Sequence, residues 1–193
     1  MKDDRNFNIQ NFYSLIADNT KDFSGRNWLF TQIKEWLSDP NGLRYLLITG
    51  KAGTGKSTIA ARLWEISEGL IKDPHLEKEL SAIYVCSARE DESINPISFS
   101  KSLSKQLVKR DIDFAKELIE NSKGDEFKKI TISSNIKNST ANQINGIIIN
   151  IKEINVYGVS PIILFSTIFR EPLEYVLNKN PNKKFVLLID SLD

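Results

Sequence analysis

The sequence is poor in the residues that carry disulfide, zinc and histidine chemistry. It contains one cysteine, Cys86, and one histidine, His75. A single cysteine cannot form an internal disulfide or a cysteine-based zinc site, and a single histidine argues against a histidine-dependent triad or a multi-histidine metal site. Cys86 ends a strand-like run and is expected to be a small buried apolar residue. This composition suits a reducing, cytoplasmic setting.

Long apolar runs and a strong net charge are also missing. The longest apolar stretch, residues 159–169, is interrupted by a proline and by hydroxyl side chains, so no membrane association is expected. A net charge of +1 gives no argument for nucleic acid as a ligand. The 193 residues, 40% of them apolar, suffice for one globular domain with a sizeable core.

The most informative stretch is residues 50–57, which we call the glycine loop. Its sequence is Gly50-Lys51-Ala52-Gly53-Thr54-Gly55-Lys56-Ser57, which fits the pattern G-x-x-x-x-G-K-[ST] of phosphate-binding loops. Glycines let the chain wrap so that backbone N–H groups converge on phosphate oxygens. Lys56 can then reach the β- and γ-phosphates, and the Ser57 hydroxyl can bind Mg²⁺. A helix that continues through Thr58 would add its positive N-terminal end.

The surroundings of the glycine loop fit this interpretation. Residues 43–49 form a leucine- and isoleucine-rich run, which predicts a strand buried on both faces. From Lys56 to about Glu68, apolar residues recur at helical spacing. The alternative is an ordinary glycine-rich turn before a helix, but that alternative explains neither Lys56 nor Ser57.

A second apolar run, residues 185–189, ends on Asp190. A buried parallel strand would carry this carboxylate to the edge of the sheet where phosphate and Mg²⁺ bind, as a Walker B strand does. Taken alone, an aspartate in this position would more simply be a turn or a helix cap. Together with the glycine loop it predicts a carboxylate that holds Mg²⁺.

The remaining pattern alternates strands and helices, which predicts an α/β fold with a parallel sheet. Helices are expected at 27–38, 96–109, 111–121 and 161–177, the last interrupted near Glu171-Pro172, and a strand at 81–87. Residues 122–158 break the rhythm and predict a β-hairpin-like insertion. Trp28, Trp36 and Trp64 fall on or beside apolar helical stripes, which favours helix packing over stacking on bases.

These residues together resemble the nucleotide-binding domain of STAND ATPases, the NACHT and NB-ARC-like signalling NTPases. Besides the glycine loop, the matching segments are Phe23-Ser24-Gly25-Arg26, Trp36-Leu37, Pro96-Ile97-Ser98-Phe99, Pro172-Leu173 and Leu188-Ile189-Asp190-Ser191-Leu192-Asp193. The first and the last of them narrow the choice among P-loop families. The resemblance implies a partial three-layer P-loop NTPase domain at 23–193, with an incomplete core. The polar residues 1–22 are expected to be a lead-in segment.

The resemblance also implies a function. Such domains act as switches in which ADP holds a closed state, and ATP exchange and hydrolysis control self-association. Lys56, Ser57 and Asp190 would bind phosphate and Mg²⁺, and Asp193 matches the family's second acidic position. Gly25 and Arg26 match a segment beside the base and ribose, although Arg26 could instead be a surface residue. No Asn-Lys-x-Asp segment that would read guanine occurs, which disfavours a GTPase, and the resemblance implies ATP and ADP as the nucleotides.

The family fold places a strand from later sequence between the strand before the loop and the Walker B strand. The chain ends at Asp193, so we expect a fragment that binds nucleotide weakly and hydrolyses it poorly. Two other functions stay open. One is a nucleotide-binding scaffold that does not hydrolyse, and the other is a P-loop enzyme such as a small-molecule kinase.

Overall fold

The structure is a computed structural model that describes residues 25–73, 75–88, 90–122, 130–139 and 146–191. The lead-in expected at 1–22 and Asp193 lie outside these ranges. The described elements are α2 (Asn27–Ser38), α3 (Lys56–Ser67), β1 (Leu80–Val85), α4 (Asp91–Ile94), α5 (Pro96–Arg110), α6 (Ile112–Asn121), β2 (Ile130–Ser139), β3 (Gly146–Val156), α7 (Pro161–Phe165), the π-helix η2 (Ser166–Arg170), α8 (Glu171–Lys179) and β4 (Val186–Asp190). The fold is mixed α/β, as the alternation of patterns predicted.

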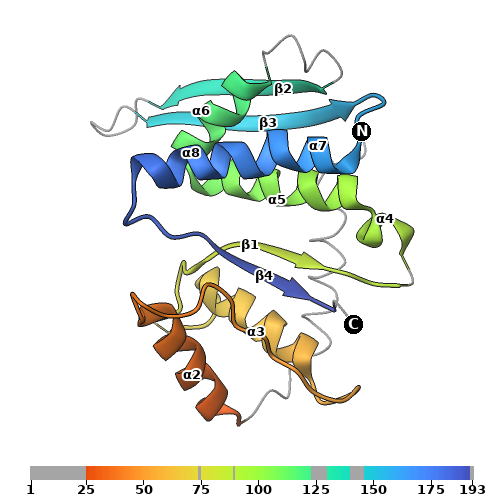
Figure 1. The fold of residues 1–193 in the computed structure, drawn as a ribbon. Helices are drawn as coiled ribbons and strands as arrows, with labels where there is room; N and C mark the ends of the chain where they lie inside the picture. Colours follow the sequence, from red (N-terminus) through yellow and green to blue (C-terminus); the bar gives the residue numbers. More distant parts are fainter. Residues whose placement is uncertain (1–24, 74, 89, 123–129, 140–145, 192–193) are drawn as a thin grey trace.

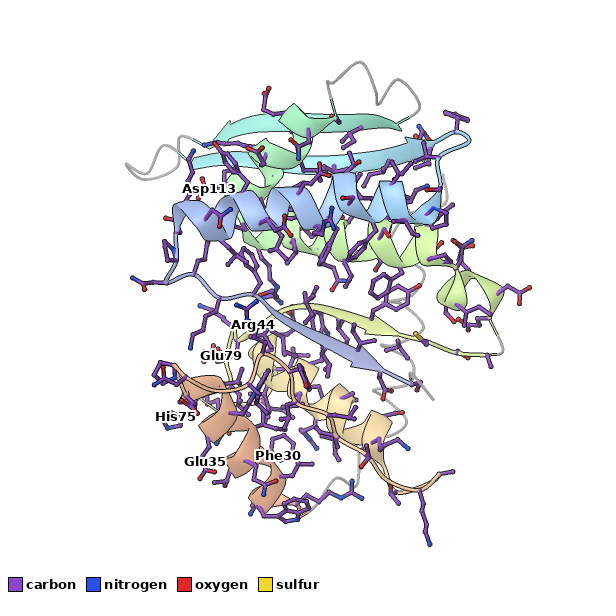
Figure 2. The ribbon with its side chains drawn as sticks, viewed as in Figure 1. Phe30, Glu35, Arg44, His75, Glu79 and Asp113 are labelled. Carbon is purple, nitrogen blue, oxygen red and sulfur yellow. The ribbon has the colours of Figure 1, made fainter. Side chains whose placement is uncertain are left out.

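A parallel pair of strands, β1 and β4, lies between two layers of helices (Figure 1). Ile83 lies opposite Leu188, and Val85 lies opposite Asp190. Successive side chains of a strand point to opposite faces, so each strand contributes to two cores. Ile83 and Leu188 pack with α2 and α3, whereas Tyr84 packs with α5 to α8 on the other face. In the first of these cores, Phe30 of α2 points toward α3 (Figure 2).

The helix boundaries follow the capping signals of the sequence. The Asn95 side chain accepts a hydrogen bond from the Ile97 N–H at 2.9 Å, and Pro96 occupies the first helical position of α5. Asp111 caps α6 in the same way through the Phe114 N–H, also at 2.9 Å. The helices expected at 27–38, 96–109 and 111–121 are therefore confirmed within one or two residues.

The irregular stretch at 122–158 contains the expected hairpin. Strands β2 and β3 pair antiparallel, with Ile130 opposite Val156. Ile149 and Ile154 of β3 are buried in the core that α5 shares. The hairpin covers the side of α5 that faces away from the parallel sheet (Figure 1). It therefore forms a second, separate sheet.

The last helical stretch is interrupted just before Pro172, close to where the sequence places the break. A proline has no N–H to donate to the carbonyl four residues earlier, here that of Ile168. The Ser104 hydroxyl of α5 donates to this carbonyl at 2.7 Å. The π-helix η2 immediately precedes α8. The irregular turn is thus fixed by a hydrogen bond from a neighbouring helix.

One predicted element is wrong. Residues 43–49 contain no strand, and the described parallel sheet has two strands rather than the expected larger one. The backbone groups of residues 44–49 form no hydrogen bond with one another or with any other described residue. The side chains of Tyr45 and Leu47 are 74% and 73% exposed. Residues 43–49 thus have the apolar composition of a strand, but no strand among the described residues pairs with them.

The outer edge of β1 is closed by a side chain. The Ile83 N–H donates to Gln106 Oε1 at 3.0 Å, and Gln106 Nε2 donates to the Ile83 carbonyl at 2.8 Å. In a parallel strand both groups of one residue point to the same side, here away from β4. Gln106, itself buried, therefore replaces a neighbouring strand at this position.

Replacing Gln106 with leucine is expected to destabilise the fold by about 2–4 kcal/mol, because two buried backbone groups of Ile83 lose their partners. Urea denaturation of both chains measures this difference. Lys109→Ala, a change at an exposed position of the same helix, is the control and should stay within about 0.5 kcal/mol. Equal stability of Gln106→Leu and the parent chain would show that water replaces the amide.

Candidate functional site

The glycine loop forms a tight turn that leads into α3. Gly53 and Gly55 have φ angles of 77° and 80°, in the left-handed region that favours glycine. Thr54 closes the turn, with its N–H 3.2 Å and its hydroxyl 2.8 Å from the Lys51 carbonyl oxygen. Lys51 and Ala52 lie exposed on the rim. The glycines are thus placed where the backbone requires them.

Several backbone amides at the loop and the start of α3 are available to a ligand. Gly53, Gly55, Ser57 and Thr58 donate to no acceptor among the described residues. The first amides of a helix have no partner within it, and α3 has no side-chain cap. The N-terminus of this 12-residue helix also carries the positive end of its dipole. These features together suit an anion such as phosphate.

Lys56 lies against the loop, with its Nζ donating to the Gly50 carbonyl at 2.8 Å. Gly50, Lys56 and Asp190 line one cavity of about 560 Å³. The structure therefore brings together two groups that are 134 residues apart in the sequence, counted from Lys56 to Asp190. Ser57 is half-buried at the start of α3 but does not line this cavity.

Asp190 ends β4 at the edge of the sheet and is 7% exposed. Its Oδ2 is buried and has no hydrogen-bond partner among the described residues. The backbone holds the residue in place, because its carbonyl accepts the Cys86 N–H at 3.1 Å. Burial raises the pKa of the Cys86 thiol, and the nearby Asp190 carboxylate raises it further. Cys86 is therefore a protonated, half-buried thiol beside the carboxylate.

Asp190, whose Oδ2 is buried and unpartnered among the described residues, lines a cavity together with Lys56, and this pairing fits a hydrated Mg²⁺. Magnesium is usually held by one or two protein ligands together with substrate phosphates and water. Within the described ranges, no group of three or more histidine, cysteine, aspartate or glutamate side chains could hold a metal on its own. The residues present thus fit Mg²⁺ that arrives with a phosphate ligand.

Arg26 reaches the glycine loop from the start of α2. Its guanidinium donates to the Thr54 carbonyl and, at 3.3 Å, to the Gly55 carbonyl. The residue is half-buried, and Gly25 beside it is exposed. Arg26 thus contacts the glycine loop, and no described contact places Gly25 or Arg26 beside a base or a ribose. Phe23 and Ser24 lie outside the described residues.

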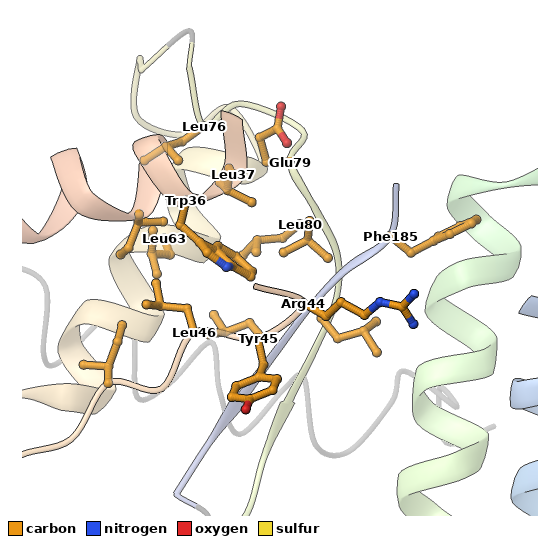
Figure 3. A pocket seen from close by; sticks show the side chains of 15 residues that line it. Trp36, Leu37, Arg44, Tyr45, Leu46, Leu63, Leu76, Glu79, Leu80 and Phe185 are labelled. Carbon is orange, nitrogen blue, oxygen red and sulfur yellow. The ribbon is translucent and has the colours of Figure 1, made fainter. Parts of the chain in front are cut away.

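An apolar groove separates residues 44–50 from β4, and we call it the central groove. Two adjoining cavities form it, of about 280 Å³ and 560 Å³, and they share Tyr45, Leu46 and Leu187 among their lining residues. Figure 3 shows the smaller cavity, lined by side chains that include Trp36 and Leu80. The sequence pattern predicted that the residues that line the groove pack within strands and helices. Nothing in the pattern indicated that a groove would separate them.

The three tryptophans differ in their surroundings. Trp64 is 4% exposed and packs in the core, as predicted. Trp36 lines the central groove, and its indole N–H donates to the Leu43 carbonyl at 2.7 Å. Trp28 is 64% exposed, so the prediction that it packs between helices is wrong. It occupies the first turn of α2, on a side that no described element covers.

A family model described as "Nephrocystin 3, N-terminal" matches residues 25–157. The chain belongs to this family. The match is to the nephrocystin-3 N-terminal family and not to the NACHT or NB-ARC domains that the residues resemble. It begins at Gly25 and includes Arg26, the glycine loop, β1 and the hairpin. Asp190 lies outside the matched residues of this nephrocystin-3 N-terminal chain.

No curated protein and no solved structure matches the chain. Among the helices that the structure describes in this nephrocystin-3 N-terminal chain, none is both long enough and apolar enough to cross a membrane.

Proposed function

We propose that the chain binds ATP and ADP together with Mg²⁺, as the nucleotide-binding module of a STAND-type signalling ATPase in the cytoplasm. The observation that carries this proposal is the shared cavity of Lys56 and Asp190. Lys56 supplies a cation and Asp190 a buried carboxylate to the lining of a cavity that Gly50 of the glycine loop also borders. A phosphate and its Mg²⁺ would neutralise both.

The chemistry of each residue follows from its position. The amides of the glycine loop and of the first turn of α3 would donate to the phosphate oxygens. Lys56 would exchange its bond to the Gly50 carbonyl for the β- and γ-phosphates, since a charged acceptor binds an ammonium more strongly than a carbonyl does. Ser57 and Asp190 would hold Mg²⁺, which neutralises phosphate charge when it is bound.

The central groove supports the STAND-like part of the proposal. Strand β4 pairs with β1 on one side, and no described strand pairs with its other edge. Residues 45–50 and residues 187–190 of β4 both line the larger cavity of the groove. The STAND resemblance places a further strand between these two segments, and such a strand would bury Tyr45 and Leu47. In that arrangement residues 43–49 would become the strand that their sequence predicts.

Hydrolysis is expected to be weak in this chain. Among the described residues that line the larger cavity, Asp190 is the one carboxylate, and it is assigned to Mg²⁺. Cleavage of a phosphoanhydride also needs a group that orients the attacking water. This observation favours the nucleotide-binding scaffold as the second candidate function. The switch in self-association would then depend on which nucleotide is bound.

Nucleotide titrations test the proposal. The chain is expected to bind Mg-ATP and Mg-ADP at one site. Its affinity for Mg-GTP should be lower by a factor of about ten or more, which corresponds to a difference of about 1.4 kcal/mol in binding free energy. Isothermal titration calorimetry measures all three affinities. Size-exclusion chromatography with each nucleotide then reports on self-association. Absence of binding to every nucleotide would refute the proposal, and equal affinities would refute the preference for adenine.

A further inference from the structure

Arg26 contacts the glycine loop, and this contact suggests that the residue acts on the loop rather than on the base or ribose of a nucleotide. We propose that Arg26 is a positioning residue that orients the amides of the glycine loop toward a bound phosphate. This inference rests on the proposed function, because it assigns a task within the same phosphate site. Three features of the structure support it: the direction of the peptide groups, the backbone at residues 25–26, and the absence of a side chain at Gly55.

The first feature is the orientation of two peptide groups. A trans peptide is planar, and its C=O and N–H point in opposite directions. The Thr54 carbonyl shares its peptide with the Gly55 N–H, and the Gly55 carbonyl shares its peptide with the Lys56 N–H. Arg26 binds both carbonyls. It therefore holds the two N–H groups on the side of the loop away from itself, where a phosphate would lie.

The second feature is the backbone that delivers the guanidinium. Gly25 and Arg26 have φ angles of 82° and 60°, so two consecutive residues are left-handed. This conformation is unfavourable for an arginine and occurs where the surroundings fix it. It precedes α2 directly, and the Arg26 carbonyl accepts the Leu29 N–H at 2.9 Å. The start of α2 thus holds the arginine in a position from which it reaches a loop 28 and 29 residues later.

The third feature is the close approach at Gly55. A Cβ at this position would lie 3.1 Å from the Arg26 guanidinium. A side chain there would therefore push the guanidinium aside slightly, in addition to the strain of a φ of 80°. Among the described residues, no carboxylate forms an ion pair with Arg26. The guanidinium polarises the two peptide groups whose carbonyls it binds.

Tripolyphosphate separates this role from a contact with the base, because it carries phosphates but neither base nor ribose. Arg26→Ala is expected to weaken binding of Mg-tripolyphosphate by about tenfold, and binding of Mg-ADP by a similar factor. Arg26→Lys, which keeps one cationic donor but not the fork, should fall between Arg26→Ala and the parent chain. Arg44→Ala removes a positive charge from the far end of the central groove and is the matched control, with affinity changed less than about twofold.

Calorimetry on the four chains, with thermal unfolding as a check of folding, gives the answer. If Arg26→Ala weakens Mg-ADP but leaves Mg-tripolyphosphate unchanged, Arg26 contacts base or ribose and the inference is wrong. If Arg26→Ala unfolds, Arg26→Lys decides, since unchanged tripolyphosphate affinity there would also overturn the inference. If the parent chain binds neither ligand, the proposed nucleotide function fails, and the positioning role falls with it.

Discussion

Lys56→Ala is expected to lower the affinity of the chain for Mg-ATP by about tenfold to a hundredfold. A hydrogen bond to a charged group contributes about 1.5–3 kcal/mol, and each 1.4 kcal/mol is a factor of ten in affinity. The Lys56 ammonium lies in the cavity that also contains Asp190, so its removal leaves the phosphates facing a carboxylate without the compensating cation. Isothermal titration calorimetry of both chains measures the loss.

Lys51→Ala is the matched control for this change. Lys51 belongs to the same loop and carries the same charge, but its side chain is exposed on the rim. Its removal should weaken binding less than about threefold, the size of a screened surface interaction. Equal losses for Lys51→Ala and Lys56→Ala would mean that only the net charge of the loop matters. Unchanged affinity in Lys56→Ala would refute Lys56 as a phosphate ligand.

Asp190→Asn is expected to separate metal binding from folding. The buried Oδ2 without a partner makes the carboxylate costly in the absence of a cation, so a neutral amide of the same shape should raise the free energy of unfolding by about 1 kcal/mol. The same change should abolish the gain in ATP affinity that Mg²⁺ provides. Thermal unfolding in EDTA measures the first effect, and ATP titrations with Mg²⁺ or with EDTA measure the second.

A gain in stability together with loss of the dependence on Mg²⁺ is the result expected of a metal ligand. The alternative of a turn or cap residue predicts a loss of stability of about 1 kcal/mol and no change in the dependence on Mg²⁺. Asp113→Asn is a suitable control. Asp113 is an exposed aspartate in the first turn of α6, and it is not among the residues that line the cavity. It should leave the dependence on Mg²⁺ unchanged.

Much of the secondary structure could be predicted because its signals are local. Asn95-Pro96 fixed the start of α5, and the apolar run that ends on Asp190 predicted β4 correctly. The hairpin β2–β3 was also predicted, although its pairing register was not. The sequence predicted that Lys56 and Asp190 belong to one phosphate site, and the two residues line one cavity in the structure.

The features that the sequence could not predict depend on partners distant in the chain. Residues 43–49 have the composition of a buried strand, but a strand forms only with a neighbour, and no described segment pairs with them. Trp28 follows an apolar stripe, yet no described element covers its side of α2. The bonds of Arg26 to the glycine loop depend on two left-handed residues, which no pattern of hydrophobicity reveals. The hydrogen bonds of Gln106 to the Ile83 backbone, which replace a neighbouring strand, also depend on a tertiary contact that the sequence does not reveal.

The most direct test of the central claim is a map of where the nucleotide binds. Two-dimensional ¹H–¹⁵N spectra of the labelled chain, recorded during titration with Mg-ADP, report every backbone amide separately. We expect the amides of Gly53, Gly55, Lys56 and Ser57 to shift most, and those of the hairpin β2–β3 to stay in place. No shift at millimolar Mg-ADP, or largest shifts away from the glycine loop, would contradict the claim that this loop binds phosphate.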